Sequence, residues 1–413
     1  MTSDTAGTPA STLHVQSNTE AQPAHWSGVF AMSLCVFALI ASEFMPVSLL
    51  TPMAADLHVT EGMAGRGIAI SGAFAVLASV SISWLAGAMN RKTLLLALTA
   101  LMAVSAAVVA LAPNYPVYML GRALIGIVIG GFWSMSAATA MRLVPGDQVP
   151  RALAIFNGGN ALATVLAAPL GTYLGSLMGW RGAFFCLVPV AALALVWQWA
   201  TLPSMPTRER TAGSKNAFRI LNSRPVALGM AACGVFFMGQ FTLFTYVRPF
   251  LETVTAADVS TLSLTLLAIG VAGFIGTALI GTVLKRSLYR TLIVIPSLMA
   301  VIALTLIPLG SWLAPTVALL SLWGLLATSA PVGWWSWIAK AMPHNAEAGG
   351  GLMVAVIQLA IALGSSVGGV LFDSTGYRGT FVASAAILLS ATLLAFFTSR
   401  AQLRQAHQAT DHR

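Results

Sequence analysis

Long apolar runs separated by short polar segments extend along nearly the whole chain. A bilayer core about 30 Å thick is crossed by about 20 helical residues, because each residue advances the helix by about 1.5 Å. Runs of this length predict membrane-spanning helices, joined by short loops. The twelve predicted spans cover residues 29–50, 67–89, 93–112, 117–141, 152–176, 182–202, 226–247, 260–284, 290–311, 315–340, 351–372 and 379–398.

The composition agrees with this pattern. Apolar residues make up 57% of the chain and charged residues 8%, and the mean hydropathy is +0.84. A chain of this kind cannot hide its apolar surface in a water-soluble core. We therefore predict an all-α membrane protein.

The distribution of Lys and Arg predicts the orientation. Most of these residues fall in the tails and in the loops on the same side as the tails, and only Arg66, Arg181, Arg248 and Arg378 fall in loops on the other side. The positive-inside rule then places both termini in the cytoplasm. This orientation accounts for the net charge of +9, so no nucleic-acid binding is expected.

The longest polar connection divides the chain into two equal halves. Residues 1–25 lack Lys and Arg and are expected to form a disordered tail. The predicted units are a tail over 1–25, a six-helix bundle over 26–202, a cytoplasmic linker over 203–225, a second six-helix bundle over 226–398 and a tail over 399–413.

An internal repeat supports this division. At an offset of about 197 residues, similar residues recur from the first helix of each half to the last, and a second echo at an offset of about 202 joins the fourth helices. In transporters built from two such repeats, the substrate binds near the membrane midplane between the halves. The pairs are Glu43-Phe44 with Gln240-Phe241, Pro52 with Pro249, Gly171 with Gly368, Gly179-Trp180-Arg181-Gly182 with Gly376-Tyr377-Arg378-Gly379, and Gly131-Phe132-Trp133-Ser134 with Gly333-Trp334-Trp335-Ser336.

Three motifs resemble those of a known family. Residues 83–92 are similar to G-x-L-A-D-R-x-G-R-K, although Gly87 and Ala88 replace its first charged pair, and Arg122 lies in a membrane-embedded arginine motif. Residues Ala168, Pro169 and Gly171 resemble the antiporter motif G-P-x-x-G, whose small residues allow close helix packing. The chain thus resembles the major facilitator superfamily, in particular its drug:proton antiporters with twelve spans.

Longer stretches indicate a cargo. The segments EFMPVSLLTPMAADL, GGFWSMSAATAMRLVP, GQFTLFTYVRPF, PVGWWSWI and VAVIQLA resemble the purine ribonucleoside efflux pumps of that superfamily. This resemblance implies proton-coupled efflux of purine ribonucleosides such as inosine and guanosine across the cytoplasmic (inner) membrane of a bacterium. The alternatives are a proton-coupled exporter of sugars or drugs, or a membrane enzyme or receptor of another class. No catalytic set lies at membrane depth, so no enzyme is expected.

Glu43 and Arg122 are the charged residues expected at the membrane midplane, at nearly equal depth. A charge in hydrocarbon must be neutralised, paired or exposed to a water-filled cavity. One interpretation makes Glu43 the proton carrier and Arg122 a partner that stabilises its ionised form. The other is a static salt bridge that holds the first and fourth helices together.

Amide and aromatic side chains supply candidate cargo contacts. Gln240, Gln358, Asn157 and Asn160 each carry a hydrogen-bond donor and an acceptor within a span, and each can bind cargo or bond another helix. Trp133 and Trp334 are candidates for stacking on a base, whereas Trp337 fits an interfacial belt. Arg248 is expected to reach toward the membrane surface or to form part of a gate.

The remaining residues suggest no bound group. The cysteines Cys35, Cys186 and Cys233 lie in apolar spans without metal-ligand spacing, and the sequence has no phosphate-binding G-x-x-x-x-G-K-[ST] loop. We therefore expect no metal, no cofactor and no use of ATP. The expected partners are a small-molecule cargo, protons and the lipid bilayer, and the chain is expected to act as a monomer.

Overall fold

The computed structural model describes residues 24–85, 89–135, 139, 142–145, 148–206, 223–342 and 346–411, and within these ranges every regular element is helical. Most of the predicted linker and of the N-terminal tail, and residues 86–88 of the loop motif, lie outside the described residues. The elements are α1 (Trp26–Asp56), α2 (Glu61–Leu85), α3 (Arg91–Ala110), α4 (Tyr115–Trp133), α6 (Val149–Phe185), α7 (Leu187–Thr201), α8 (Arg224–Phe244), α9 (Val247–Thr253), α10 (Val259–Leu309), α11 (Leu313–Ala341) and α12 (Ala346–Asp411).

The described helices supply twelve segments of the length and polarity needed to cross a membrane. Nine of the described helical stretches are long and apolar enough to span a bilayer. Three of these stretches contain 51 or more residues, and a straight helix of that size would be about 77 Å long, more than twice the bilayer core. Each is interrupted by a non-helical residue, namely Gly179, Ser287 or Gly376, where the chain turns back. Each therefore supplies two crossings, which confirms the predicted number.

Gly179 and Gly376 make the same turn in the two halves. Their φ angles are 75° and 68°, and their ψ angles are 166° and −167°. Backbone in this region is essentially restricted to glycine, because a Cβ atom would clash there. The two residues are partners in the internal repeat, so the repeat specifies where each half reverses its last pair of helices.

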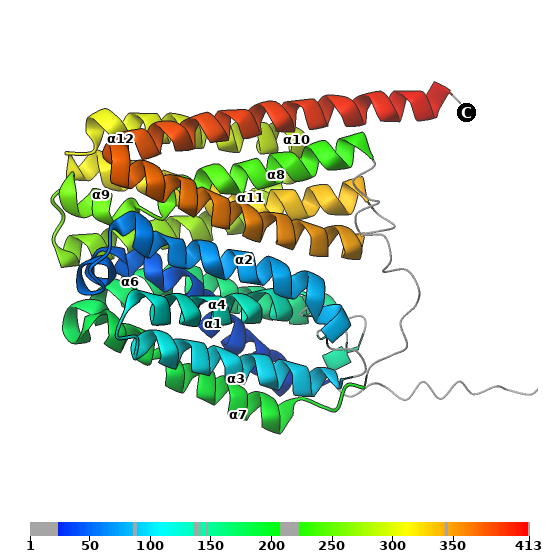
Figure 1. The fold of residues 1–413 in the computed structure, drawn as a ribbon. Coiled ribbons are helices and arrows are strands. Elements are labelled where there is room, and N and C mark those ends of the chain that lie inside the picture. The colour runs from blue at the N-terminus through cyan, green and yellow to red at the C-terminus, as the bar shows by residue number, and fades with distance from the viewer. Residues whose placement is uncertain are drawn as a thin grey trace, which may run out of the picture.

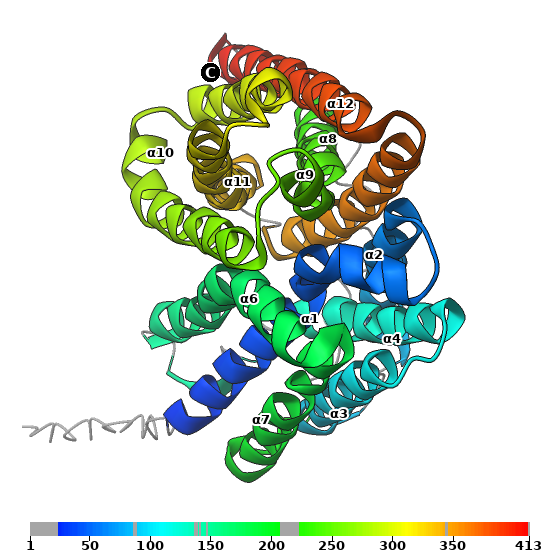
Figure 2. The ribbon, with the colours of Figure 1, turned by 90° about the vertical axis from the view of Figure 1, so that its left-hand side faces the viewer.

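The helices form two bundles, α1 to α7 and α8 to α12, which lie side by side in Figures 1 and 2. We call the end of the molecule where α1 and α8 begin the tail end. The opposite end, which carries α9, Gly179 and Gly376, is called the hairpin end (left in Figure 1). The bundles meet where α2 packs on α12 and where α6 packs on α10.

Repeat partners pack in equivalent ways around this interface. The rings of Phe44 and Phe241 stack on each other, with centroids 6.0 Å apart and planes inclined by 21°. In the N-terminal bundle Gly171 lies against Ser48 of α1, and in the C-terminal bundle its partner Gly368 lies against Thr242 of α8. The pseudo-symmetry therefore brings α1 and α8 face to face at the centre of the molecule.

Candidate functional site

Two prolines within α1 prepare the site. Pro46 and Pro52 lie inside the helix and have no backbone N–H, so the carbonyls four residues earlier, on Ser42 and Ser48, lose their helical partners. Each carbonyl accepts a hydrogen bond from a buried arginine. Nη1 of Arg122 donates to the Ser42 carbonyl at 2.7 Å, and Nη1 of Arg248 donates to the Ser48 carbonyl.

Arg122 is enclosed by neutral acceptors. Its side chain from α4 is 1% exposed. Besides Ser42, its Nε donates to the Gly67 carbonyl at 3.1 Å, and its Nη2 donates to Ser71 Oγ at 3.1 Å and to the backbone carbonyl of Glu43 at 3.5 Å. These acceptors lie on α1 and α2, so Arg122 joins three helices of the N-terminal bundle.

The ion pair expected between Glu43 and Arg122 is not formed. Arg122 reaches the backbone carbonyl of Glu43, whereas the carboxylate oxygen Oε1 accepts from Nε2 of Gln358 at 3.3 Å. The prediction failed because equal depth says nothing about how each helix is rotated. The freed Ser42 carbonyl draws the guanidinium to the backbone side of α1. The carboxylate is left to face α12 of the other bundle.

Glu43 and Gln358 therefore meet at the contact between bundles, and Gln240 is buried on α8. Glu43 is 5% exposed, Gln358 is 7% exposed and Gln240 is 9% exposed. The amide oxygens Oε1 of Gln240 and Gln358 are buried and have no hydrogen-bond partner. A buried carbonyl without a donor costs free energy, so these two acceptors mark a place where a donor-bearing ligand would bind favourably.

The position of Gln240 relative to Glu43 follows from Phe241, the next residue in the chain. Because Phe241 stacks on Phe44, the repeat partners Gln240 and Glu43 lie on facing turns of α8 and α1. Six residues earlier on α8, Gly234 touches the side chain of Val356 from α12, two residues before Gln358. The two glutamines thus lie on adjoining helices of the C-terminal bundle.

The asparagines belong to α6, toward the tail end. Asn157 is exposed and its Nδ2 donates to the Leu153 carbonyl of its own helix at 3.0 Å, and the Asn160 carbonyl accepts from Thr164 Oγ1 at 2.9 Å. Helical spacing puts both on the face that carries Thr164, which packs against Gly270 of α10. The structure shows neither of them in contact with Glu43.

The tryptophans lie inside their own bundles. Trp334 is 2% exposed and meets Trp337 edge-on, with ring centroids 5.9 Å apart. Trp337 is fully buried against Gly229, so the interfacial position expected for it is wrong. A glycine on α8 leaves room for the indole, which sequence spacing does not reveal. Trp133 is half-buried and meets Phe132 edge-on.

The antiporter-like motif lies in the second contact between bundles. The Pro169 carbonyl accepts from Ser263 Oγ of α10 at 3.0 Å, and Gly171 allows α1 to approach α6. Because Pro169 has no N–H, the Val165 carbonyl is also free, and it lies where Gly270 leaves space. Ala168 is half-buried against the core of the C-terminal bundle. The motif thus brings backbone of both bundles close together.

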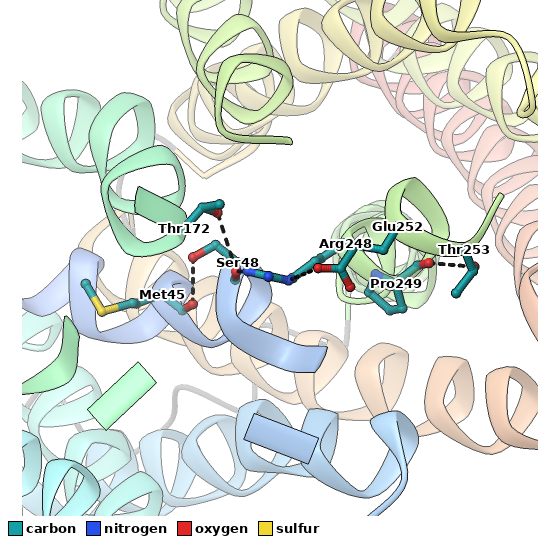
Figure 3. Close-up of polar contacts among 7 residues, drawn as sticks. All are labelled: Met45, Ser48, Thr172, Arg248, Pro249, Glu252 and Thr253. Atoms are coloured by element: carbon teal, nitrogen blue, oxygen red, sulfur yellow. Dashed lines mark hydrogen bonds and ion pairs between the residues drawn. The ribbon is translucent and has the colours of Figure 1, made fainter. Parts of the chain in front are cut away.

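Further contacts close the hairpin end. Figure 3 shows Arg248 between the Ser48 carbonyl and the Glu252 carboxylate, which accepts from Nε at 2.8 Å; the same Ser48 carbonyl accepts from Thr172 Oγ1 at 3.5 Å. Asp373 of α12 accepts from Thr60 Oγ1 at 2.7 Å and from the backbone N–H of Gly62 at 3.0 Å, where α2 begins. Arg248 therefore bonds across the bundles and does not extend toward the membrane surface.

Sequence reasoning missed Ser42, Ser48 and Ser71, whose backbone or hydroxyl oxygens bind the two arginines. The first two were detectable, since each serine precedes a proline by four residues within an apolar run. Ser71 carries no comparable signal.

A family model supports these observations. The model described as Major Facilitator Superfamily matches residues 32–365. The chain belongs to the major facilitator superfamily. It is accordingly a multi-pass membrane transporter and not an enzyme, as the sequence predicted, and its cargo is a small molecule.

The chain is similar to two bacterial proteins over most of its length. The chain is 67% identical over 384 residues to the "Transcription regulatory protein OpdE" of Pseudomonas aeruginosa, covering 92% of this chain and 96% of the relative. It is 40% identical over 370 residues to the "Purine ribonucleoside efflux pump NepI" of Salmonella paratyphi C, covering 90% of this chain and 93% of the relative.

Solved structures share the fold at low sequence identity. A bacterial homologue of the human lysosomal transporter Spinster superposes with a TM-score of 0.73 at 16% identity, covering 93% of this chain and 98% of that one. A D-xylose–proton symporter gives a TM-score of 0.73 at 15% identity, covering 90% and 96%.

Proposed function

We propose that the protein is a proton-coupled exporter of purine ribonucleosides such as inosine and guanosine. The observation that carries the proposal is the buried contact of Glu43 with Gln358 between the bundles, where the amide oxygen of Gln358 has no partner. An acidic group at this depth suits a proton carrier. The 40% identity to purine ribonucleoside efflux pumps supports the choice of cargo.

The arrangement of contacts supports an alternating-access cycle. The contacts between bundles that involve Arg248, Asp373 and Glu43 lie between the centre and the hairpin end. With the tail end in the cytoplasm, as the loop charges predict, this is a state closed to the outside. The bundles over residues 26–202 and 226–398 then rock as two units, so cargo enters from the cytoplasm and leaves at the hairpin end.

The name of the Pseudomonas aeruginosa relative suggests gene regulation instead. A buried carboxylate and amides between two membrane bundles have no use in binding DNA, whereas they suit a neutral polar cargo. We therefore favour transport. An exporter of sugars or drugs stays the alternative cargo assignment.

Vesicles loaded with labelled inosine test the function. We expect efflux to require an imposed pH gradient, and Glu43→Gln to abolish it while binding persists, because an amide keeps the shape but cannot carry a proton. Glu61→Gln, at the first residue of α2, is the matched control and should retain efflux. Full gradient-driven efflux by Glu43→Gln would refute the role of Glu43.

Cells that overproduce the protein test the cargo. We expect resistance to toxic purine ribonucleosides, weakened more by Gln240→Ala or Gln358→Leu than by Trp337→Phe, whose side chain lies in the core. Protection against lipophilic cations alone would identify a drug exporter.

Reporter fusions test the orientation. A reporter after Ser214 or Arg404 should be cytoplasmic, and one near Asn114 should be external. An external signal after Ser214 would overturn the proposed orientation.

A further inference from the structure

The two ends of the Gln358 amide have different environments. Its Nε2 donates to Glu43 Oε1 at 3.3 Å, which is the donor an ionised carboxylate requires. Its Oε1 is buried without a partner, in a side chain that is only 7% exposed. The amide therefore donates to Glu43 through its nitrogen and carries an unpartnered acceptor oxygen on its other side.

Protonation of Glu43 reverses what this amide can offer. A protonated carboxyl group donates its O–H, and the strongest acceptor beside it is the amide oxygen of Gln358. When the amide rotates to accept that proton, its NH₂ group takes the position that the oxygen held. The group presented to a ligand thus changes from an acceptor to a donor.

We infer that Gln358 reads the protonation state of Glu43 and inverts the hydrogen-bonding character of the cargo site. The inference rests on the proposed function, since it takes Glu43 as the proton carrier. With Glu43 ionised, Gln358 accepts a hydrogen bond from cargo. With Glu43 protonated, the same position donates, and a donor-bearing cargo loses its partner.

Gln240 narrows the class of cargo. Its Oε1 is a second buried acceptor without a partner, on the helix that adjoins Gln358. Two acceptors call for a neutral solute with at least two N–H or O–H donors. The lactam N–H of a 6-oxopurine and the hydroxyls of ribose fit this description. We assign the lactam N–H to Gln358, so methylation at that nitrogen removes the donor that Gln358 would accept.

Among the described charged side chains, Glu43 is the one placed to change the hydrogen bonding of Gln358. Arg122 of α4 faces its backbone, with Tyr118 close to the guanidinium. Arg248 and Glu252 of α9 face α1 at Ser48, five residues farther along. The other charged side chains described on α1 and α12 and on the helices packed against α1 lie toward helix ends: Asp56, Glu61, Arg66, Arg91, Lys92, Arg151, Arg181, Asp373, Arg378 and Arg400.

Antiport follows directly from this inversion. Cargo binds from the cytoplasm while Glu43 is ionised, and a proton that arrives from outside converts Gln358 to a donor and weakens cargo binding. Protonation of Glu43 and binding of cargo to Gln358 therefore oppose each other although they occur at different atoms. The rotation of the Gln358 amide couples the two events.

Inosine binding to the purified protein measures the switch. From pH 5.5 to pH 8.5 we expect wild-type affinity to rise about tenfold, which is the effect of one hydrogen bond. Gln358→Met, of similar length, should bind inosine weakly and without pH dependence. The wild type should bind 1-methylinosine in the same way, weakly and without pH dependence. Gln198→Met, which changes a buried glutamine of α7, should keep the pH dependence. Wild-type pH dependence in Gln358→Met would overturn the inference.

Infrared pH-difference spectra test the switch without cargo. The wild type should show a protonated-carboxyl band at low pH that is missing in Glu43→Gln. In Gln358→Met that band should move to higher frequency, because the carboxyl group loses its amide partner. An unmoved band would overturn the inference for any cargo. If inosine fails to bind the wild type while the band moves, the proposed cargo is wrong and the switch stands.

Discussion

Arg122 and Arg248 use the same local feature in two regions of the molecule. Each is a buried arginine that donates to a carbonyl freed by a proline of α1. Arg122 binds within the N-terminal bundle, whereas Arg248 belongs to α9 of the C-terminal bundle and crosses to Ser48. A bond within a bundle persists when the bundles rock, but a bond between bundles must break. We therefore propose that Arg122 has a structural role and that Arg248 forms part of a gate.

Arg122→Ala should have the largest effect, because it leaves several buried acceptors without a donor. Each hydrogen bond to a charged group contributes about 1.5–3 kcal/mol, so we expect a loss of about 3 kcal/mol or more in stability and no transport. Thermal unfolding in detergent measures the first and vesicle efflux the second. Arg122→Lys, which keeps the charge but has fewer donors, should fall between. Wild-type unfolding of Arg122→Ala would contradict the structural role.

Arg248→Ala should change conformation more than stability. We expect the hairpin end to open about tenfold more often, because one charged hydrogen bond between bundles is lost. The readout is labelling of Leu50→Cys by a membrane-impermeant thiol reagent, in a protein without its native cysteines; Leu50 is fully buried beside Tyr246. Arg181→Ala is the control, since its ion pair with Asp56 lies within one bundle. Equal labelling in Arg248→Ala and Arg181→Ala would contradict a gating role for Arg248.

Replacing the prolines sharpens the comparison. Pro46→Ala and Pro52→Ala each restore an N–H that competes for the Ser42 or Ser48 carbonyl. We expect Pro46→Ala to slow efflux several-fold without increasing Leu50→Cys labelling. Pro52→Ala should raise that labelling about threefold, less than Arg248→Ala does. Pro296→Ala, in α10, is a control for removing a helix proline. Identical behaviour of the first two variants would contradict separate roles.

Asp373→Asn should have the smallest effect. The amide keeps one acceptor for Thr60 or Gly62 but removes the negative charge at the N-terminus of α2. Charges at a helix terminus contribute little when exposed, so we expect labelling of Leu50→Cys to rise about twofold. Unchanged labelling would show that Asp373 takes no part in closing the hairpin end.

The sequence singled out several polar residues that the structure buries, but not their partners. Glu43 and Gln358 meet at the junction of the bundles, and Arg122 lies behind the backbone of Glu43. Polarity within an apolar run is visible in the sequence because its cost in lipid is local. Trp334 and Trp337 were harder to place, since an indole suits a core, a binding site or a membrane surface equally well. Their neighbours in the fold decided between these.

Consecutive residues by themselves determined that this is a helical membrane protein with repeated halves. Lipid offers backbone groups no hydrogen-bond partner, so each apolar run of sufficient length must form a helix, and the repeat follows from residue identity at a constant offset. Tertiary structure alone decided that Glu43 meets Gln358, 315 residues away, and that Arg122 binds carbonyls instead of the carboxylate. The physical reason is that these contacts depend on how each helix is rotated, and packing against neighbouring helices sets that rotation.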